Sequence, residues 1–386
     1  MQCCCFVFMK ILFVTDQFYH SNNGTTISSR RFAQTLRSRG HEVRIVSCGT
    51  PEDLEDGETA YLMEKIHIPV FDGLISAQGM TIAKTDYALL EEAVKWADVV
   101  HFFMPFPLEK HGVEICIRTG TPYTAAFHIQ PENISYNIKM GRIKPVNDAI
   151  YAWMNNYFYK YVRHIHCPSR FIAKELMAHG FHNTIHVISN GIDPDFKYEK
   201  HEKCPELEGK FVILSVGRYS PEKKQGVLLE AVKHSKYSDN IQVILAGQGP
   251  DKKKLYGMGQ KLKNPPIMNF YTKEELLEVM AQSDLYVHCA AAEIEAMACM
   301  EAFARGLVPV IADSEKSATP QFALTRNCLF APDDPKNLAK HIDYFIEHER
   351  ERKILEKRYA ESAKAYSLEK CVTMAEDMFR TAMEGR

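Results

Sequence analysis

The sequence contains no uninterrupted apolar stretch of the roughly 18–20 residues that a membrane-spanning helix needs, so any membrane contact should be peripheral. Neither sign of charge is in excess. The 47 Lys and Arg residues nearly balance 49 Asp and Glu residues, and the formal net charge of −2 argues against a nucleic-acid partner. The 11 cysteines show no spacing typical of a metal site. We expect a cytoplasmic protein with reduced thiols, located in part on the inner face of the cell membrane.

No signal-peptide pattern surrounds the run Cys3-Cys4-Cys5. Met9 leads directly into the apolar run Ile11–Val14, which reads as the first strand. We therefore expect residues 1–8 to be a start-site artefact or a disordered leader.

Two halves of the chain repeat one pattern, in which short apolar runs alternate with amphipathic segments. Ile11–Val14, a helix at 27–39 and Glu42–Val46 form a βαβ unit, and further strands are predicted at 99–103 and 123–128. After a turn-rich stretch near Gly191 the pattern restarts, with strands predicted at Phe211–Val216, Ile241–Ala246, Leu285–His288 and Val308–Ala312. The sequence predicts an α/β protein with two doubly wound domains, 9–190 and 191–365, facing each other across a cleft. A last helix within 366–386 is expected to pack back on the first domain. No Gly-x-Gly-x-x-Gly follows a predicted strand, which argues against a dinucleotide-dependent dehydrogenase.

Glu293 and Glu301 are the most specific pair of polar residues. A helix predicted at 296–304 is apolar nearly all round, so a glutamate within it is unlikely to be an ordinary solvated residue. The start of this helix offers free N–H groups to an anion. The spacing suits contacts with two ends of one elongated ligand. Solvated surface glutamates remain the alternative.

A second candidate site follows the predicted strand Phe211–Val216. Its loop carries Arg218 and Lys223, two cations well placed to neutralise a diphosphate. Because this role is electrostatic, we expect Lys223→Ala to slow turnover by orders of magnitude and to leave the melting temperature nearly unchanged. A solvated loop could also carry such residues.

With these motifs in order, the chain resembles the family 4 glycosyltransferases of the GT-B fold. The motifs are Gly24, Ser189–Asp193, Gly217-Arg218 with Glu222-Lys223, Gly247–Pro250, and Glu293 through Glu301. Within that family it is most similar to bacterial diacylglycerol- and ceramide-type lipid glucosyl- or galactosyltransferases, in the segments 128–133 and 317–319. The resemblance implies retaining transfer of a hexose, glucose or galactose, from a UDP-hexose to a membrane lipid.

The resemblance also implies roles for individual residues. Arg218 and Lys223 would hold the diphosphate, Glu301 the ribose, and Glu293 the hydroxyls of the hexose. His128 would contact the transferred sugar. The other residues expected to bind the donor are Gly24, Gly217, Phe270, Tyr271, Ile294, Glu295 and Ala296; Phe270 could equally belong to the core. Gln130, Glu132 and Asn133 are candidates for the acceptor site.

Two features depart from the family pattern or compete with it. The family has Gly, an aromatic residue and Gly after the first glutamate, where this chain has Ile294-Glu295-Ala296, which puts the identity of the hexose in doubt. Asp193-Pro194-Asp195 spells an Asp-x-Asp pattern that holds a divalent metal in other transferases. The turn before it indicates an interdomain linker, so we expect neither a metal nor a cofactor.

The stretch 136–163 mixes five basic residues with seven aromatic ones, as in a helix on an anionic bilayer. A helix that packs its aromatic side chains into the first domain is the alternative. Three further functions stay open: transfer to a polysaccharide or small molecule, sugar-nucleotide epimerisation on the same fold, and sugar binding without catalysis.

Overall fold

A computed structural model describes residues 8–19, 24–66, 81–137 and 143–385. These residues form two compact units. The first comprises residues up to 131, 145–191 and those from 368 onward, and the second comprises 132–144 and 192–367. Of residues 1–8, which we expect to be a leader or a start-site artefact, all but Phe8 lie outside the described residues. None of the helices in these ranges combines the length and apolar character needed to cross a membrane.

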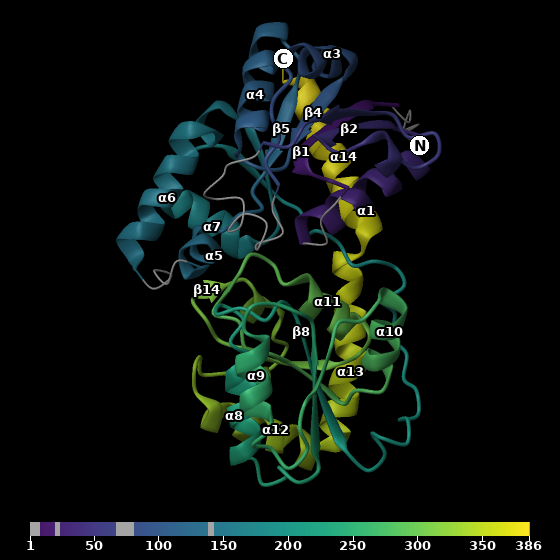
Figure 1. The fold of residues 1–386 in the computed structure, drawn as a ribbon, viewed down its shortest axis with the longest axis vertical. Coiled ribbons are helices and arrows are strands. Elements are labelled where there is room, and N and C mark those ends of the chain that lie inside the picture. Colours follow the sequence, from purple (N-terminus) through teal and green to yellow (C-terminus); the bar gives the residue numbers. More distant parts are fainter. Residues whose placement is uncertain (1–7, 20–23, 67–80, 138–142, 386) are drawn as a thin grey trace, which may run out of the picture. The chain divides into compact units, whose positions relative to one another are not determined.

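The first unit is built on a seven-stranded parallel sheet, whose strand order is β3-β2-β1-β4-β5-β6-β7 (Figure 1). β1 is almost wholly buried, which explains its continuous apolar sequence, since a parallel strand is covered on both faces. The strands are β1 (Lys10–Gln17), β2 (Glu42–Cys48), β3 (Ala60–Met63), β4 (Val99–Phe102), β5 (Tyr123–Ala126), β6 (His164–Cys167) and β7 (Thr184–Val187).

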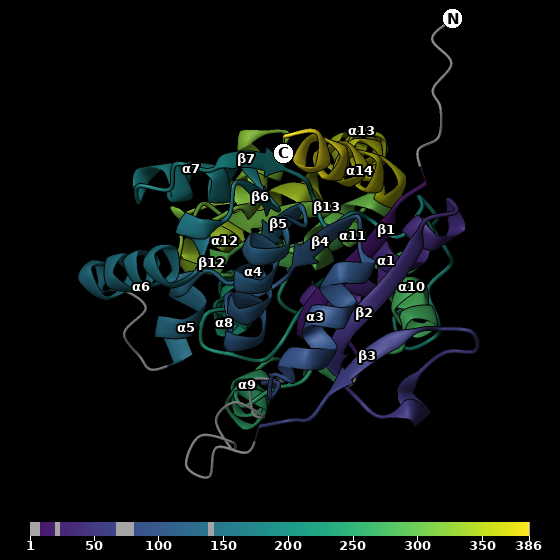
Figure 2. The ribbon, with the colours of Figure 1, turned by 90° about the horizontal axis from the view of Figure 1, so that it is seen from above.

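Helices cover both faces of this sheet, and Figure 2 shows α14 and α3 on opposite faces. Phe32 of α1 and Phe379 of α14 belong to one buried cluster with Ile11 and Phe13 of β1. α3 begins where the Asp86 carboxylate accepts hydrogen bonds from two free N–H groups. The helices are α1 (Gly24–Ser38), α3 (Tyr87–Trp96), α4 (Pro107–Thr119), α6 (Lys144–Tyr157), α7 (Arg170–Ala178) and α14 (Leu368–Glu384), whereas α5 (Pro131–Asn137) belongs almost wholly to the second unit.

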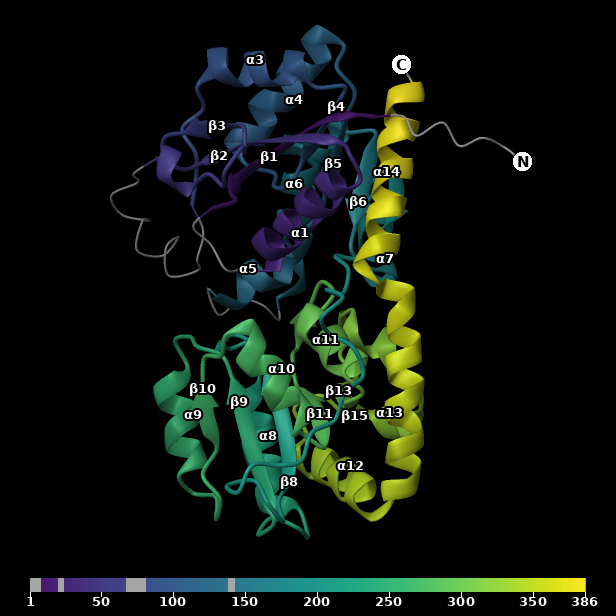
Figure 3. The same ribbon diagram turned by 90° about the vertical axis from the view of Figure 1, so that its right-hand side faces the viewer.

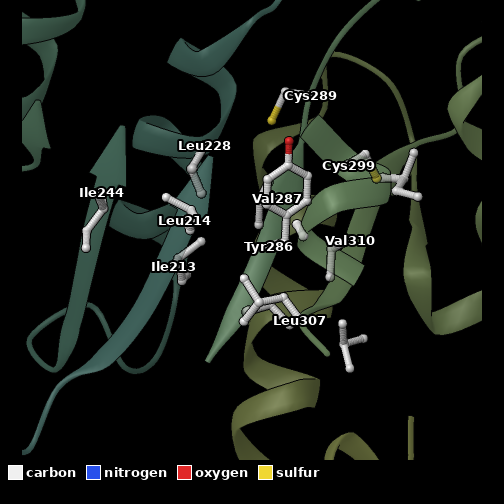
Figure 4. Close-up of a cluster of buried hydrophobic side chains, with 14 of the residues drawn as sticks. Ile213, Leu214, Leu228, Ile244, Tyr286, Val287, Cys289, Cys299, Leu307 and Val310 are labelled. Atoms are coloured by element: carbon white, nitrogen blue, oxygen red, sulfur yellow. The ribbon is translucent and has the colours of Figure 1, made fainter. Parts of the chain in front are cut away.

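The second unit has a six-stranded parallel sheet of order β10-β9-β8-β11-β13-β15. Figure 3 shows it with α12 and α13 beside its last strands, and Figure 4 shows β8 and β11 side chains in its core, among them Leu214 and Val287. The strands are β8 (Phe211–Val216), β9 (Ile241–Ala246), β10 (Ile267–Asn269), β11 (Leu285–His288), β13 (Val308–Ala312) and β15 (Leu329–Phe330).

The helices of this unit are α8 (Gln225–His234), α9 (Lys252–Gly259), α10 (Lys273–Ala281), α11 (Met297–Ala304), α12 (Pro335–Glu347) and α13 (Glu349–Ala363). A separate two-stranded parallel sheet joins β12 (Ala292–Glu293) to β14 (Lys316–Ser317). The prediction of two parallel α/β domains is therefore confirmed. The pattern missed β3, β6, β7, β10 and the two-residue strands β12, β14 and β15, and it started α1 three residues late. The segment Gly24–Thr26 looks like a polar loop, but it forms the first turn of α1, where the Thr25 and Thr26 carbonyls accept hydrogen bonds from the Ser28 and Ser29 hydroxyls.

Candidate functional site

The order of strands in the second unit positions the candidate site. The chain passes from β8 to β9 on one side, and β11 later pairs with β8 on the other side. Such a reversal of strand order creates a crevice beyond the carboxyl ends of the strands, where α/β proteins bind ligands. The loops that follow β8 and β11 carry Lys223 and Glu293, respectively, so this topology brings the two motifs together.

Glycines let the loop after β9 approach the loop after β8 closely. A Cβ on Gly247 would lie 2.1 Å from the Gly217 carbonyl oxygen, and a Cβ on Gly249 would lie 2.5 Å from the Tyr219 carbonyl oxygen. Both distances are far below van der Waals contact, so neither glycine can be replaced without moving backbone. Gly217 therefore sits in a tightly packed turn that fixes the start of the cationic loop.

Half-buried Lys223 and buried Glu293 form an ion pair, in which the Lys223 ammonium donates to Glu293 Oε1. Glu293 is only 7% exposed. Burial alone raises its pKa, but the charge of Lys223 and the contact with His288 outweigh burial and lower the pKa to about 2. Glu293 is ionised at neutral pH. Because Lys223 neutralises a buried carboxylate, its removal should also lower stability, so the ion pair argues against an unchanged melting temperature.

The backbone of Glu293 is fixed from both sides. It pairs with Ser317 in the small sheet, and its carbonyl accepts a hydrogen bond of 2.8 Å from the Ala318 N–H. The N–H of Ala291 donates to the Glu222 carbonyl at 2.7 Å, which ties the loop after β11 to the loop after β8. These bonds hold the carboxylate and the cationic loop in one rigid frame.

Helix α11 starts directly after this frame. Ala296, its N-cap, has the left-handed backbone conformation with φ 67° and ψ 66°, which non-glycine residues rarely adopt. The resemblance had placed a glycine of the family here, and the backbone retains the conformation that favours glycine. Glu301 lies in the second turn and is 9% exposed, while Glu295 is 1% exposed. Ile294, between Glu293 and Glu295 in the sequence, is half-buried.

The remaining residues predicted to bind the donor lie on neighbouring loops. Arg218 is half-buried directly after Gly217, and its carbonyl accepts from the Gln225 side chain at 2.8 Å. Phe270 follows β10 and is 61% exposed, so its alternative assignment to the core is wrong. Tyr271 is half-buried and packs against the core cluster.

His128 lies in the first unit, two residues beyond the end of β5. Its ring stacks on Phe103 at 5.9 Å and meets the His166 ring edge-on at 5.4 Å. Burial, with a smaller contribution from His166, lowers the pKa of His128 to about 3. Its Nε2 atom is buried and has no hydrogen-bond partner among the described residues. His128 is therefore a neutral imidazole at physiological pH, able to form a hydrogen bond.

The other residues that the first half of the sequence offers for the donor and acceptor sites lie in two different places, at the start of α1 and near the start of α5. Gly24 is the first residue of α1. Gln130 and Glu132 are fully buried at the start of α5, and Asn133 is half-buried. Within the second unit, Glu132 Oε1 lies 3.4 Å from the Lys316 ammonium of β14, the strand that pairs with Glu293. One acceptor candidate is thus connected to the frame of the donor site.

The Asp-x-Asp pattern is occupied by a cation of the protein itself. The Lys273 ammonium lies 2.8 Å from Asp193 Oδ2 and 2.5 Å from Asp195 Oδ2. Across the described ranges, no group of three or more His, Cys, Asp or Glu side chains could hold a metal ion. The pattern therefore has an electrostatic role in its own unit, next to the start of α10.

Sequence reasoning missed His288, the last residue of β11. Its Nε2 atom lies 3.3 Å from Glu293 Oε1, and the side chain is 6% exposed. A histidine at the carboxyl end of a predicted strand, five residues before the first motif glutamate, was the signal available in the sequence. Contact with Glu293 depends on the turn between them, which the sequence pattern did not describe.

With this geometry in place, two family descriptions match consecutive parts of the chain. Residues 22–196 match glycosyltransferase family 4, and residues 196–365 match the glycosyl transferases of group 1. This is a glycosyltransferase of the GT-B type. A GDP-mannose-dependent alpha-mannosyltransferase of Mycolicibacterium smegmatis is 25% identical over 319 residues, which cover 79% of this chain and 79% of the relative.

Solved structures share the fold of this glycosyltransferase. Anabaena HepE in complex with UDP-glucose superposes with a TM-score of 0.73 at 16% identity, over 97% of this chain and 99% of that chain. The catalytic domain of the Helicobacter pylori cholesterol-alpha-glucosyltransferase is 47% identical over 41% of this chain and 99% of that domain, with a TM-score of 0.40.

Proposed function

We propose that this glycosyltransferase moves glucose or galactose from a UDP-hexose to a membrane lipid, with retention of the anomeric configuration and without a metal ion. The ion pair of half-buried Lys223 and buried, ionised Glu293 beyond β8 and β11 is the observation that supports it. A cation and a carboxylate fixed side by side match a ligand with an anionic diphosphate and a sugar rich in hydroxyl groups. The complex of HepE with UDP-glucose supports the choice of nucleotide.

The chemistry follows from where the charges lie. Arg218 and Lys223 would stabilise the negative charge that develops on the departing diphosphate, as preorganised cations do in other transferases. Glu293 would orient the hexose through its hydroxyls, and Glu301 would bind the ribose. The acceptor hydroxyl would attack from the face that the diphosphate leaves, and a phosphate oxygen would take its proton. No covalent bond from Glu293 to the sugar is required.

A surface of α6 supports a lipid acceptor. Trp153 is 53% exposed, and a shallow apolar depression beside it is lined by Pro145, Val146, Ala149, Ile150 and Trp153. Three aromatic side chains of the same stretch, Tyr151, Phe158 and Tyr159, are fully buried, so the stretch packs one face into the core and exposes another. Exposed apolar area flanked by basic residues suits an anionic bilayer. Lys139 and Arg142 lie outside the described residues.

Product analysis tests the proposal. The purified protein is incubated with UDP-glucose, UDP-galactose or GDP-mannose, in the presence or absence of vesicles that contain diacylglycerol or ceramide. We expect a glycolipid only with vesicles and a UDP-hexose, and a small anomeric coupling constant in its proton NMR spectrum. A β-linked product would refute retention. Transfer from GDP-mannose alone would assign the donor of the mycobacterial relative, and an altered sugar nucleotide without acceptor would indicate an epimerase.

A further inference from the structure

His288 is a buried polar residue for which the functional proposal has no role. It ends β11 with 5% of its surface exposed, and its ring lies nearly parallel to that of Tyr286 at 6.2 Å. Tyr286 belongs to the core of the second unit (Figure 4). The imidazole is therefore held by the strand and by the core, and its Nε2 atom is directed at Glu293.

Two side chains approach the same oxygen of Glu293. The Lys223 ammonium donates to Oε1, and His288 Nε2 lies 3.3 Å from that same atom. Lys223 provides the stronger contact, since the His288 Nε2 atom is buried without a well-aligned hydrogen bond in the described residues. Both of these contacts are made to Oε1, and neither involves the second oxygen, Oε2.

Under the proposed mechanism, Lys223 binds two different groups in turn. Without donor it neutralises Glu293, whereas a bound diphosphate offers it several charged oxygens. As Lys223 turns toward the diphosphate, the buried Glu293 carboxylate loses its main partner. An unpaired charge in such a site is costly, so another donor must replace the ammonium. The His288 Nε2 atom already lies within reach of Oε1.

We propose that His288 is a positioning residue for the sugar half of the donor. His288 holds Glu293 by Oε1 once Lys223 has turned to the diphosphate, and it thereby directs Oε2 at a hydroxyl of the hexose. This inference rests on the proposed function and adds the group that keeps the glutamate in place during binding. His288 acts through Glu293, so its removal affects the sugar and spares the nucleotide.

Calorimetric titration separates the two halves of the donor. The full chain and two variants are titrated with UDP and with UDP-glucose, and in parallel with GDP and GDP-mannose. His288→Phe keeps a buried ring and loses the donor, whereas His288→Gln keeps an N–H donor of similar reach. A hydrogen bond to a charged group corresponds to roughly a ten- to hundredfold change in affinity. We expect His288→Phe to weaken the sugar nucleotide by that factor and to leave the free nucleotide within about twofold. His288→Gln should recover most of the loss.

His341→Phe is the matched control, because His341 is a half-buried histidine of the same unit that bonds to the Asn327 carbonyl at 2.9 Å. It should alter neither affinity, and thermal melting verifies that each variant folds. Equal weakening of nucleotide and sugar nucleotide in His288→Phe overturns the inference in favour of a structural role, as does an unchanged affinity for both. If the unaltered protein binds none of the four ligands, the proposed function fails, and this inference fails with it. If UDP and UDP-glucose bind with equal affinity and the variant changes neither, only the inference fails.

Discussion

Replacing Lys223 by methionine should destabilise the second unit, because the change leaves Glu293 buried and charged. Glu293 is 7% exposed and receives the Lys223 ammonium on Oε1. Methionine retains the aliphatic stem, so the loss is chiefly that of the positive charge. Removal of one partner from a buried ion pair typically costs about 3–5 kcal/mol.

The pKa of Glu293 predicts a loss of stability of similar size. Its value is about 2 in the folded protein, against an ordinary 4.5, and one pKa unit corresponds to about 1.4 kcal/mol. The ionised carboxyl therefore contributes about 3 kcal/mol at neutral pH. Because the folded pKa is the lower one, this contribution is fully present above pH 4.5 and is lost as the pH falls from 4.5 toward 2. We expect Lys223→Met to lower the free energy of unfolding by about 3 kcal/mol at pH 7, and by progressively less below pH 4.5.

Urea unfolding, followed by two signals, is the suitable assay. The two tryptophans, Trp96 and Trp153, belong to the first unit, so their fluorescence reports that unit alone, whereas far-ultraviolet circular dichroism reports both. Lys223→Met should shift the transition seen only by circular dichroism. The double variant with Glu293→Gln should recover most of the loss, because it removes the unpaired charge.

Lys263 provides a control in the same unit. Its ammonium lies 2.6 Å from Asp239, but both side chains are 64% exposed, so Lys263→Met should change stability little. If Lys223→Met unfolded at the urea concentration of the unaltered protein at pH 7, or lost equal stability at pH 3.5, the pairing described above would be wrong.

Three further outcomes are expected. Ala296→Gly should raise the free energy of unfolding by up to about 1 kcal/mol in urea titrations, because a left-handed alanine costs about 1–2 kcal/mol and glycine returns part of that as unfolded-state entropy; a lower stability would contradict the φ of 67°. Gly191→Ala should lower the melting temperature more than Gly57→Ala, since both have φ 79° but only Gly191 would place its Cβ 2.8 Å from Leu368 Cα; equal losses would show that backbone conformation alone matters. Exhaustive chelation should leave the transfer rate unchanged, and recovery of lost activity by added manganese or magnesium would refute metal independence.

The local sequence was sufficient to predict the central strands of the second sheet. β8, β9, β11 and β13 have the bounds that their apolar runs predicted, because a parallel strand covered on both faces needs a continuous apolar sequence. The strand His164–Cys167 was missed because two of its four residues are histidines, whose burial depends on neighbours in space. The exposure of Phe270 likewise depends on what packs around the end of β10.

The sequence by itself determined that two parallel α/β units exist and which loops carry charge. It placed Lys223 after one buried strand and Glu293 after another, because strand and loop alternate with a period that is readable along the chain. Only the tertiary structure decided that these two residues form a pair, since their contact requires β11 to lie next to β8. The left-handed backbone of Ala296 and the contact of His288 with Glu293 were also decided only by the tertiary structure. Each depends on how distant strands are ordered within a sheet, and strand order is set by packing over the whole unit, which no local window of residues contains.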